Sequence, residues 1–547
     1  MNILYSLFSL FIVFVSLIGY GNLFFVRKKT NDLFIILLTG YFIIGFITLF
    51  LHFFLPINTF LSLMIIFFGF FLLIFTKFNF LERKFWVYLF LLMCTSILLI
   101  GYSNHAIDAN MYHHPYVSYL KSEKIIFSIA NIQFRFGHIS LMQYVQSALT
   151  NDFLSPLSLS SLNVIFFTFF LIYCGEVLFK KNENNLIFLI VLFLSCFVMI
   201  KMGRYREFGN DLIPFLVCSY FFIKILKEKN DQITNKSIFI YLPIFACFMI
   251  SHKITYVFST LIFISIISKQ NLIFIFKEKK FILFSVTFAS LWFLKTYVET
   301  SCLIYPVIQT CIENSGWYLN GVADPEKAMW QSEIWAKGFI DNPDWRNINL
   351  KYYSDSFTWL PTWLNNHFIK ILEKLSPLFI IMIITTFYLI LHKRKTNIKN
   401  KETFINTKFF LIMLVSISLG LSIWFLNSPL FRYGTFYLVS FVTVLYIIIH
   451  YNLIIKIDYL NLKKLKIIFF ISIILFCNKN IQRYIKSNDT FLPLTNPSIE
   501  NYEFINKEPN IIRPKKLQIC YYTNYICSNE IPNIKILKKK NYYLIKG

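Results

Sequence analysis

The sequence predicts an all-α protein that crosses a membrane many times. Hydrophobic residues make up 56% of its 547 residues and charged residues only 15%, which is too little charge to cover a soluble fold of this length. Apolar runs of about 20 residues, the length that a membrane-spanning helix needs, recur along the chain. The first run is longer than a signal-peptide core and lacks a small-residue cleavage site, so we interpret it as a retained helix.

The apolar runs predict 12 to 14 spans. They lie near residues 3–26, 32–55, 57–76, 85–101, 157–179, 186–202, 211–227, 238–251, 254–270, 281–297, 375–392, 409–426, 434–450 and 465–477. The pair on either side of His252 is short and has the weakest pattern. We expect one membrane domain over residues 1–477, followed by a basic C-terminal tail or small periplasmic domain over residues 478–547.

Lysine gives the orientation of the membrane domain. Lys-rich gaps, such as 27–32, 180–185 and 393–403, alternate with gaps that lack this enrichment, and positively charged gaps face the cytoplasm. The long segments 102–156 and 298–374 then face outward, as do both chain ends. The positive charge of the tail opposes its outward placement, and the tail would be cytoplasmic if the last run did not cross. Aromatic, amphipathic pieces in both long segments are typical of interfacial helices.

The net charge of +25 does not indicate a nucleic-acid-binding protein. Binding nucleic acid would require a soluble basic domain with interleaved aromatic residues, whereas these lysines lie in short gaps between apolar runs. We expect a multi-pass membrane protein with its site on the outward-facing side.

The cysteines agree with this orientation. Six of the ten lie within apolar runs, where a free thiol behaves as a small hydrophobic group. The other four form two close pairs, Cys302 with Cys311 and Cys520 with Cys527, in segments that we place outside. Because disulfides form in oxidising surroundings, both pairs are candidate disulfides, with chance spacing as the alternative.

Arginine is enriched on the outer side, the reverse of what topology alone would produce. Three arginines lie in cytoplasmic gaps, and the five in outer gaps are Arg135, Arg204, Arg206, Arg346 and Arg432. A guanidinium group matches the geometry of phosphate, so we expect these residues to hold an anion, with a lipid-linked phosphate as the natural candidate. Local ion pairs, for example with Glu207 or Asp211, are the alternative.

Asp108 is the candidate catalytic residue. It follows the fourth span closely, at the outer membrane boundary, where partial burial would raise its pKa and suit it to act as a general base. Such a base would take the proton of a sugar hydroxyl that attacks an anomeric carbon, and a polyprenyl phosphate would leave. The alternative is structural, because Asp108 could cap a helix that begins at Ala109.

Histidines surround Asp108 in the sequence. His105, His113 and His114 could hold a divalent metal, but their spacing matches no metal motif, and interfacial hydrogen bonding is the alternative. The remaining candidates are His138, His252, Lys253 and Lys295. The last of these lies at the outer end of a span, where a lysine can bind phosphate or extend to the interface.

These residues resemble a family of poorly characterised bacterial polytopic membrane proteins. In that family an Asp precedes a Tyr-His pair, an apolar helix and an Arg-aromatic-Gly element, an order that is matched here by Asp108, Tyr112, His113, Arg135 and Gly137. Later blocks of the family are similar to "GRYREFGNDLIP", to "CLIYPV" with the Trp-rich "WQSEIWAKGF", and to "SPLFRYG". The matches span most of residues 100–435.

That family in turn resembles the GT-C superfamily of membrane glycosyltransferases, which use polyprenyl-phosphate sugars and carry an acidic residue in an early outer loop. The resemblance implies that Asp108 is the catalytic acid position and that Tyr112 and His113 join the outer arginines in the substrate site. Many GT-C enzymes carry two close acids in their first outer loop. Here the acid follows the fourth span, so Glu207 or Asp211 would supply the second.

The resemblance therefore implies an inverting, GT-C-like glycosyltransferase that moves a sugar from a polyprenyl-phosphate-linked donor to a cell-envelope glycan or lipid. It also implies a multi-pass protein of a bacterial inner membrane, with its active site facing the periplasm or the exterior. A divalent metal is compatible with the site but not required. An O-antigen polymerase or ligase is one alternative, which would depend on the arginines and on segment 298–374. A transporter or flippase for lipid-linked saccharides is another, which would carry charges in the middle of its spans.

Overall fold

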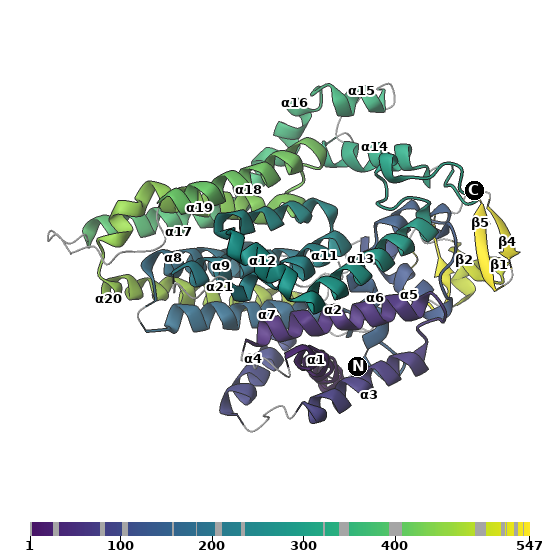
Figure 1. Ribbon diagram of the computed structural model, residues 1–547, viewed down its shortest axis with the longest axis horizontal. Helices are drawn as coiled ribbons and strands as arrows, with labels where there is room; N and C mark the ends of the chain where they lie inside the picture. The colour runs from purple at the N-terminus through teal and green to yellow at the C-terminus, as the bar shows by residue number, and fades with distance from the viewer. Residues whose placement is uncertain are drawn as a thin grey trace.

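The computed structural model in Figure 1 is an elongated bundle of helices with a small β-structure at one end. It describes residues 3–25, 32–76, 82–100, 108–155, 158–181, 183–202, 210–230, 236–320, 323–338, 349–392, 407–486, 499–515, 520, 522–529, 534–539 and 541–546. The chain is mostly helical and has several helices that could cross a membrane, which confirms the prediction of an all-α polytopic membrane protein.

Among the described residues, seven helices are long and apolar enough to cross a membrane. They are α1 (Ile3–Phe25), α2 (Leu33–His52), α7 (Ser158–Phe179), α13 (Lys279–Thr300), α17 (Ile369–Leu391), α18 (Thr407–Asn427) and α19 (Phe431–Ile455). The other seven predicted positions are also helical, but these helices are shorter or less apolar. They are α3 (Thr59–Phe75), α4 (Arg83–Ile100), α8 (Asn185–Lys201), α9 (Leu212–Asn230), α11 (Leu242–His252), η5 (Ile254–Ile266) and α21 (Lys466–Lys486).

The weak pair around His252 consists of an α-helix of 11 residues and a 3₁₀-helix of 13 residues. The α-helix α11 ends at His252, Lys253 has an extended backbone, and η5 then runs for 13 residues. A 3₁₀-helix rises about 2.0 Å per residue, so η5 covers roughly 26 Å where an α-helix of equal length would cover about 20 Å. Lys253 therefore lies at the junction of α11 and η5 and belongs to neither helix.

Glycines let the first three helices touch through their backbones. A Cβ atom on Gly19 of α1 would lie 1.9 Å from the carbonyl oxygen of Gly69 in α3, and one on Gly40 of α2 would lie 1.9 Å from that of Leu17. Small residues commonly allow such close approach between membrane helices, because lipid supplies no hydrophobic force to draw helices together.

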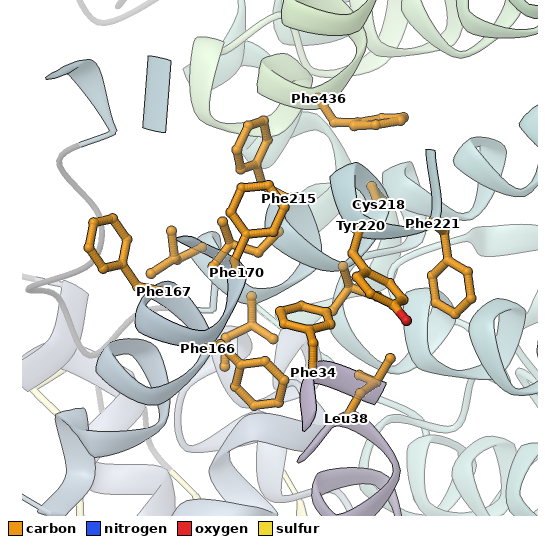
Figure 2. Close-up of a cluster of buried hydrophobic side chains, with 14 of the residues drawn as sticks. Phe34, Leu38, Phe166, Phe167, Phe170, Phe215, Cys218, Tyr220, Phe221 and Phe436 are labelled. Carbon is orange, nitrogen blue, oxygen red and sulfur yellow. The ribbon is translucent and has the colours of Figure 1, made fainter. Parts of the chain in front are cut away.

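An aromatic cluster joins α2, α7 and α9 (Figure 2). Phe34 stacks on Tyr220 with ring centroids 4.5 Å apart and meets the edge of Phe166 at 5.8 Å. The Tyr220 hydroxyl donates a hydrogen bond of 2.7 Å to Asp32, to which Lys224 also bonds. Asp32 belongs to a gap that the lysine pattern predicts to be cytoplasmic.

The two long segments predicted to face outward contain short helices. The first contains η1 (Ala109–His113), α5 (His114–Ser122), η2 (Ile129–Asn131), η3 (Phe134–His138) and α6 (Leu141–Leu149). The second contains η6 (Ile308–Thr310), α14 (Pro325–Ala336), α15 (Leu350–Asp355), α16 (Leu360–Trp363) and η9 (Leu364–Phe368). The short helices α10 (Lys236–Phe239), α12 (Lys269–Lys277) and α20 (Tyr459–Leu462) lie in gaps that we place in the cytoplasm.

The C-terminal tail folds into two small sheets that pack on the first outer segment. Strands β1 (Tyr502–Lys507), β2 (Asn510–Pro514) and β3 (Ile526–Cys527) form one, and β4 (Lys535–Lys539) and β5 (Tyr542–Lys546) form a hairpin. The backbone N–H of Phe127 donates to the Tyr543 carbonyl, and that of Ile545 donates to the Phe127 carbonyl. The tail therefore shares the side of segment 102–156, as Figure 1 shows for the yellow strands near α5.

Both candidate cysteine pairs are disulfide-bonded in the structure. Cys302 is joined to Cys311 at the start of the second outer segment, and Cys520 is joined to Cys527 in the C-terminal sheets. The remaining cysteines are free, and four of the six are buried.

Candidate functional site

Asp108 directly precedes a π-helical turn, and its side chain contacts a residue that is distant in the sequence. The turn η1 follows it directly and leads into α5, with Pro115 in the first turn of that helix. Asp108 occupies the N-cap position, but its side chain makes no capping hydrogen bond. Instead its Oδ2 accepts a hydrogen bond of 3.0 Å from Nη1 of Arg432, at the start of α19. The capping alternative thus does not describe this side chain.

The pairing with Arg432 shifts the pKa of Asp108 downward, opposite to the expected direction. Burial raises the pKa of this carboxyl, but the charge and hydrogen bond of Arg432, with the nearby His113 and Arg135, bring it below its ordinary value. The expectation of a raised pKa was wrong, because the sequence could not show that a cation would lie in contact. Asp108 is ionised at neutral pH.

A second ion pair lies beside the first. Asp211, directly before α9, pairs with Lys253 at the junction of α11 and η5. The Lys253 ammonium lies 3.5 Å from the ring centroid of Tyr433, and Nη2 of Arg432 donates to the Tyr433 hydroxyl at 2.9 Å. The ring of Tyr433 therefore joins the two ion pairs into one cluster.

Three further predicted residues, Arg135, Tyr112 and His113, belong to this cluster. The Arg135 guanidinium lies 5.9 Å from the ring centroid of Tyr112 and 4.5 Å from that of Phe134. His113 ends the π-helical turn that Asp108 precedes, and the charges of the two side chains interact. His113 is buried, and burial lowers its pKa to about 4 although Asp108 and Asp211 act in the opposite direction.

The structure thus brings together residues that are far apart in the sequence. The cluster consists of Asp108, Tyr112, His113, Arg135, Asp211, Lys253, Arg432 and Tyr433. Its three cations outnumber its two carboxylates, which favours binding of an anion. An ionised carboxylate among these groups can also accept a proton from a neighbouring hydroxyl.

Five predicted residues lie outside the described residues: Arg204, Arg206, Glu207, Arg346 and His105. Lys295 was expected to bind phosphate, but its side chain is 1% exposed and its ammonium lies 2.8 Å from the Glu299 carboxylate. The Tyr116 hydroxyl donates to the same carboxylate at 2.7 Å. The ion pair lies within α13, and the bond from Tyr116 joins α13 to α5.

The histidines serve mainly as buried hydrogen-bonding residues. Nδ1 of His114 lies 2.8 Å from the Asn110 side-chain oxygen, and Nε2 of His252 lies 2.7 Å from the Tyr41 hydroxyl. His138 is packed against Tyr305 with ring centroids 5.1 Å apart. Within the part of the chain that the structure describes, no three His, Cys, Asp or Glu residues are grouped to hold a metal. We derive no step through a divalent metal.

The sequence analysis did not identify two residues at the site, Tyr433 and Gln143. Tyr433 adjoins Arg432, and nothing in "SPLFRYG" indicates that its ring lies between two cations. Gln143, which bonds to His113 at 2.8 Å, could have been noticed, because Ser140-x-x-Gln143 is the pattern of a helix capping box.

Comparison with known proteins gives one match. A family model described as "Domain of unknown function (DUF8201)" matches residues 2–439. This range contains every residue of the cluster and ends before α21 and the C-terminal sheets. No curated protein and no solved structure matches the chain.

Proposed function

The chain belongs to the DUF8201 family, whose description carries no activity, and we propose from its site that it is a membrane glycosyltransferase. It would act on the outer face of a bacterial inner membrane. The donor would be a sugar linked to a polyprenyl phosphate, and the acceptor a glycan or lipid of the cell envelope. The observation that carries the proposal is the carboxylate of Asp108, which lies 3.0 Å from Arg432 within a cluster of charged residues.

The proposed step is a single displacement. Asp108 accepts the proton of the acceptor hydroxyl as its oxygen forms a bond to the anomeric carbon. The bond from that carbon to the donor phosphate breaks, and its electron pair leaves with the phosphate. Arg432 and Lys253 supply positive charge where the phosphate charge grows, so the leaving group needs little protonation.

Donor binding would also make Asp108 a stronger base. Arg432 is the main group that lowers the pKa of Asp108. Its Nε is buried and lacks a hydrogen-bond partner among the described residues, so the guanidinium keeps a donor for a phosphate oxygen. A phosphate that shares Arg432 would weaken its hold on Asp108, and the pKa of the carboxyl would rise toward a value suited to a general base.

Asp211 is the candidate for the second acid of the GT-C pattern. Its pairing with Lys253 gives it the same arrangement as Asp108, a carboxylate beside a cation at a helix start. This arrangement supports a role in binding the donor phosphate through Lys253, with Asp108 as the base.

The test is Asp108→Asn in the full chain, assayed for transfer of labelled sugar from polyprenyl-phosphate donors in membranes. We expect at least a 100-fold loss of transfer at unchanged expression, because a general base contributes about 10²–10⁴-fold. Asp152→Asn is the matched control, since Asp152 is another outer carboxylate and bonds only to the Thr59 hydroxyl among described residues. Full activity of Asp108→Asn together with loss in Arg432→Gln would instead favour the polymerase or ligase alternative.

A further inference from the structure

The side-chain amide of Gln143 has a fixed orientation. The backbone N–H of Ser140 donates to its Oε1 at 3.1 Å, and the Ser140 hydroxyl lies 2.7 Å from the same atom. A backbone N–H can only donate, so the atom that it meets must be the amide oxygen and not the amide nitrogen. The capping box of α6 thus leaves the NH₂ group of Gln143 facing away from Ser140, toward His113.

This orientation determines which nitrogen of His113 carries the proton. Nε2 of Gln143 lies 2.8 Å from Nδ1 of His113. An amide NH₂ group can only donate, so Nδ1 must present its lone pair. A neutral imidazole with a lone pair on Nδ1 carries its proton on Nε2. Among the described residues, that Nε2 has no hydrogen-bond partner.

The surroundings of the ring also keep it neutral. Asp108 and Asp211 favour the protonated ring, while Lys253 and Arg432 oppose it, and burial opposes it most. The pKa of His113 is accordingly lowered to about 4. A doubly protonated ring would in addition set an N–H of His113 against the NH₂ group of Gln143, which are both donors.

We infer that Gln143 is a positioning residue that holds His113 neutral and protonated at Nε2, so that the ring offers the substrate one uncharged hydrogen-bond donor beside Asp108. Such a donor suits a hydroxyl or ring oxygen of a sugar, since it adds no charge to a site that already has three cations. The same state excludes His113 as a metal ligand, because its lone pair is occupied by Gln143. The contact with a sugar rests on the proposed function, whereas the proton position does not.

Gln143→Glu tests the inference sharply. Glutamate replaces glutamine equally well in a capping box, so its carboxylate would still accept from the Ser140 N–H. The carboxylate cannot donate, so Nδ1 of His113 would have to carry a proton. We expect the pKa of His113 to rise by about 1–3 units, as it does beside an opposite charge.

The measurement is ¹⁵N NMR of the full chain with labelled histidine in lipid nanodiscs, titrated between pH 4 and 9. The His113 signals are assigned by their loss in His113→Phe. Gln143→Met removes the donor without adding charge, and Gln146→Met, which removes the amide that bonds to the Leu159 carbonyl, is the control on the same helix. We expect wild type and Gln146→Met to be Nε2-protonated and neutral at pH 7, and Gln143→Glu to be Nδ1-protonated.

A wild-type ring that is charged at pH 7, or protonated at Nδ1, would overturn the inference even if every variant failed to fold. An unchanged His113 pKa in a folded Gln143→Glu protein would do the same. Because the titration needs no substrate, a failed sugar-transfer assay would refute the proposed function and leave this inference standing. The reverse also holds, since the transfer assay of Asp108→Asn does not depend on the proton of His113.

Discussion

Arg432→Gln should remove the main electrostatic partner of Asp108 and weaken the fold by a measurable amount. The two charged atoms lie 3.0 Å apart, and Coulomb's law with an effective dielectric constant of 20 gives 332/(20 × 3.0), or about 5.5 kcal/mol, before desolvation. The side chains are 28% and 38% exposed, so solvent screens much of this attraction. We expect a coupling energy of about 1–2 kcal/mol to remain, more than an exposed pair gives.

The pH dependence of this coupling has a definite sign. Asp108 has a lower pKa in the folded protein than in the unfolded chain, because Arg432 holds its ionised form. Its contribution to stability is therefore fully present above the unfolded-state pKa of about 3.9 and is lost as the pH falls through the lower folded-state pKa. The coupling should be constant between pH 6 and 8 and disappear in acid.

The assay is a double-mutant cycle of Asp108→Asn, Arg432→Gln and the double variant, by reversible unfolding in mixed micelles. The pair Glu508 and Lys538 is the control, since its charged atoms lie 3.6 Å apart and its side chains are 77% and 62% exposed. We expect that pair to couple by no more than a few tenths of a kcal/mol. A coupling for Asp108 and Arg432 as small as that of the control would refute the account of the site given above.

Two further substitutions test the surroundings of the site. Lys295→Met should destabilise the protein by about 3–5 kcal/mol in the same unfolding assay, because it leaves the Glu299 carboxylate buried without its cation. Adding Glu299→Leu should restore most of that loss, and failure to do so would contradict a purely structural pair. Gly137→Ala should reduce sugar transfer with little loss of expression, because its Cβ would lie 2.3 Å from the Tyr305 ring and displace the turn that carries Arg135. Normal transfer by this variant would show that the position of Arg135 does not matter.

The long helices of this protein could be predicted because each lies in an apolar run of the sequence. Apolar runs give the spans, and Pro115 and the Ser140–Gln143 capping box give starts of helices. The 3₁₀ form of η5 could not be predicted, because the same apolar residues would also fit an α-helix. The length of that run was the only signal.

The site could be predicted only in part, because its chemistry depends on contacts between distant segments. Asp108 and Arg432 were each recognised, but they are 324 residues apart and nothing local states that they pair. That single contact decides the sign of the pKa shift of Asp108. For Lys295 the deciding contact is local. Its place at the end of a span suggested a position at the membrane interface, but it is buried and pairs with Glu299, one helical turn further along.

The pairing of the C-terminal hairpin with Phe127 has a consequence for how the protein is made. The Phe127 backbone groups bond to Tyr543 and Ile545, which are synthesised more than 400 residues later. At about 5–20 residues per second, the first outer segment is synthesised roughly 20–80 s before its strand partner. The backbone of Phe127 can therefore pair with the hairpin only after nearly the whole chain has been made. A chain that stopped short of β5 could insert all of its long helices and still lack a finished outer face, so completion of synthesis itself would determine when the site becomes ordered.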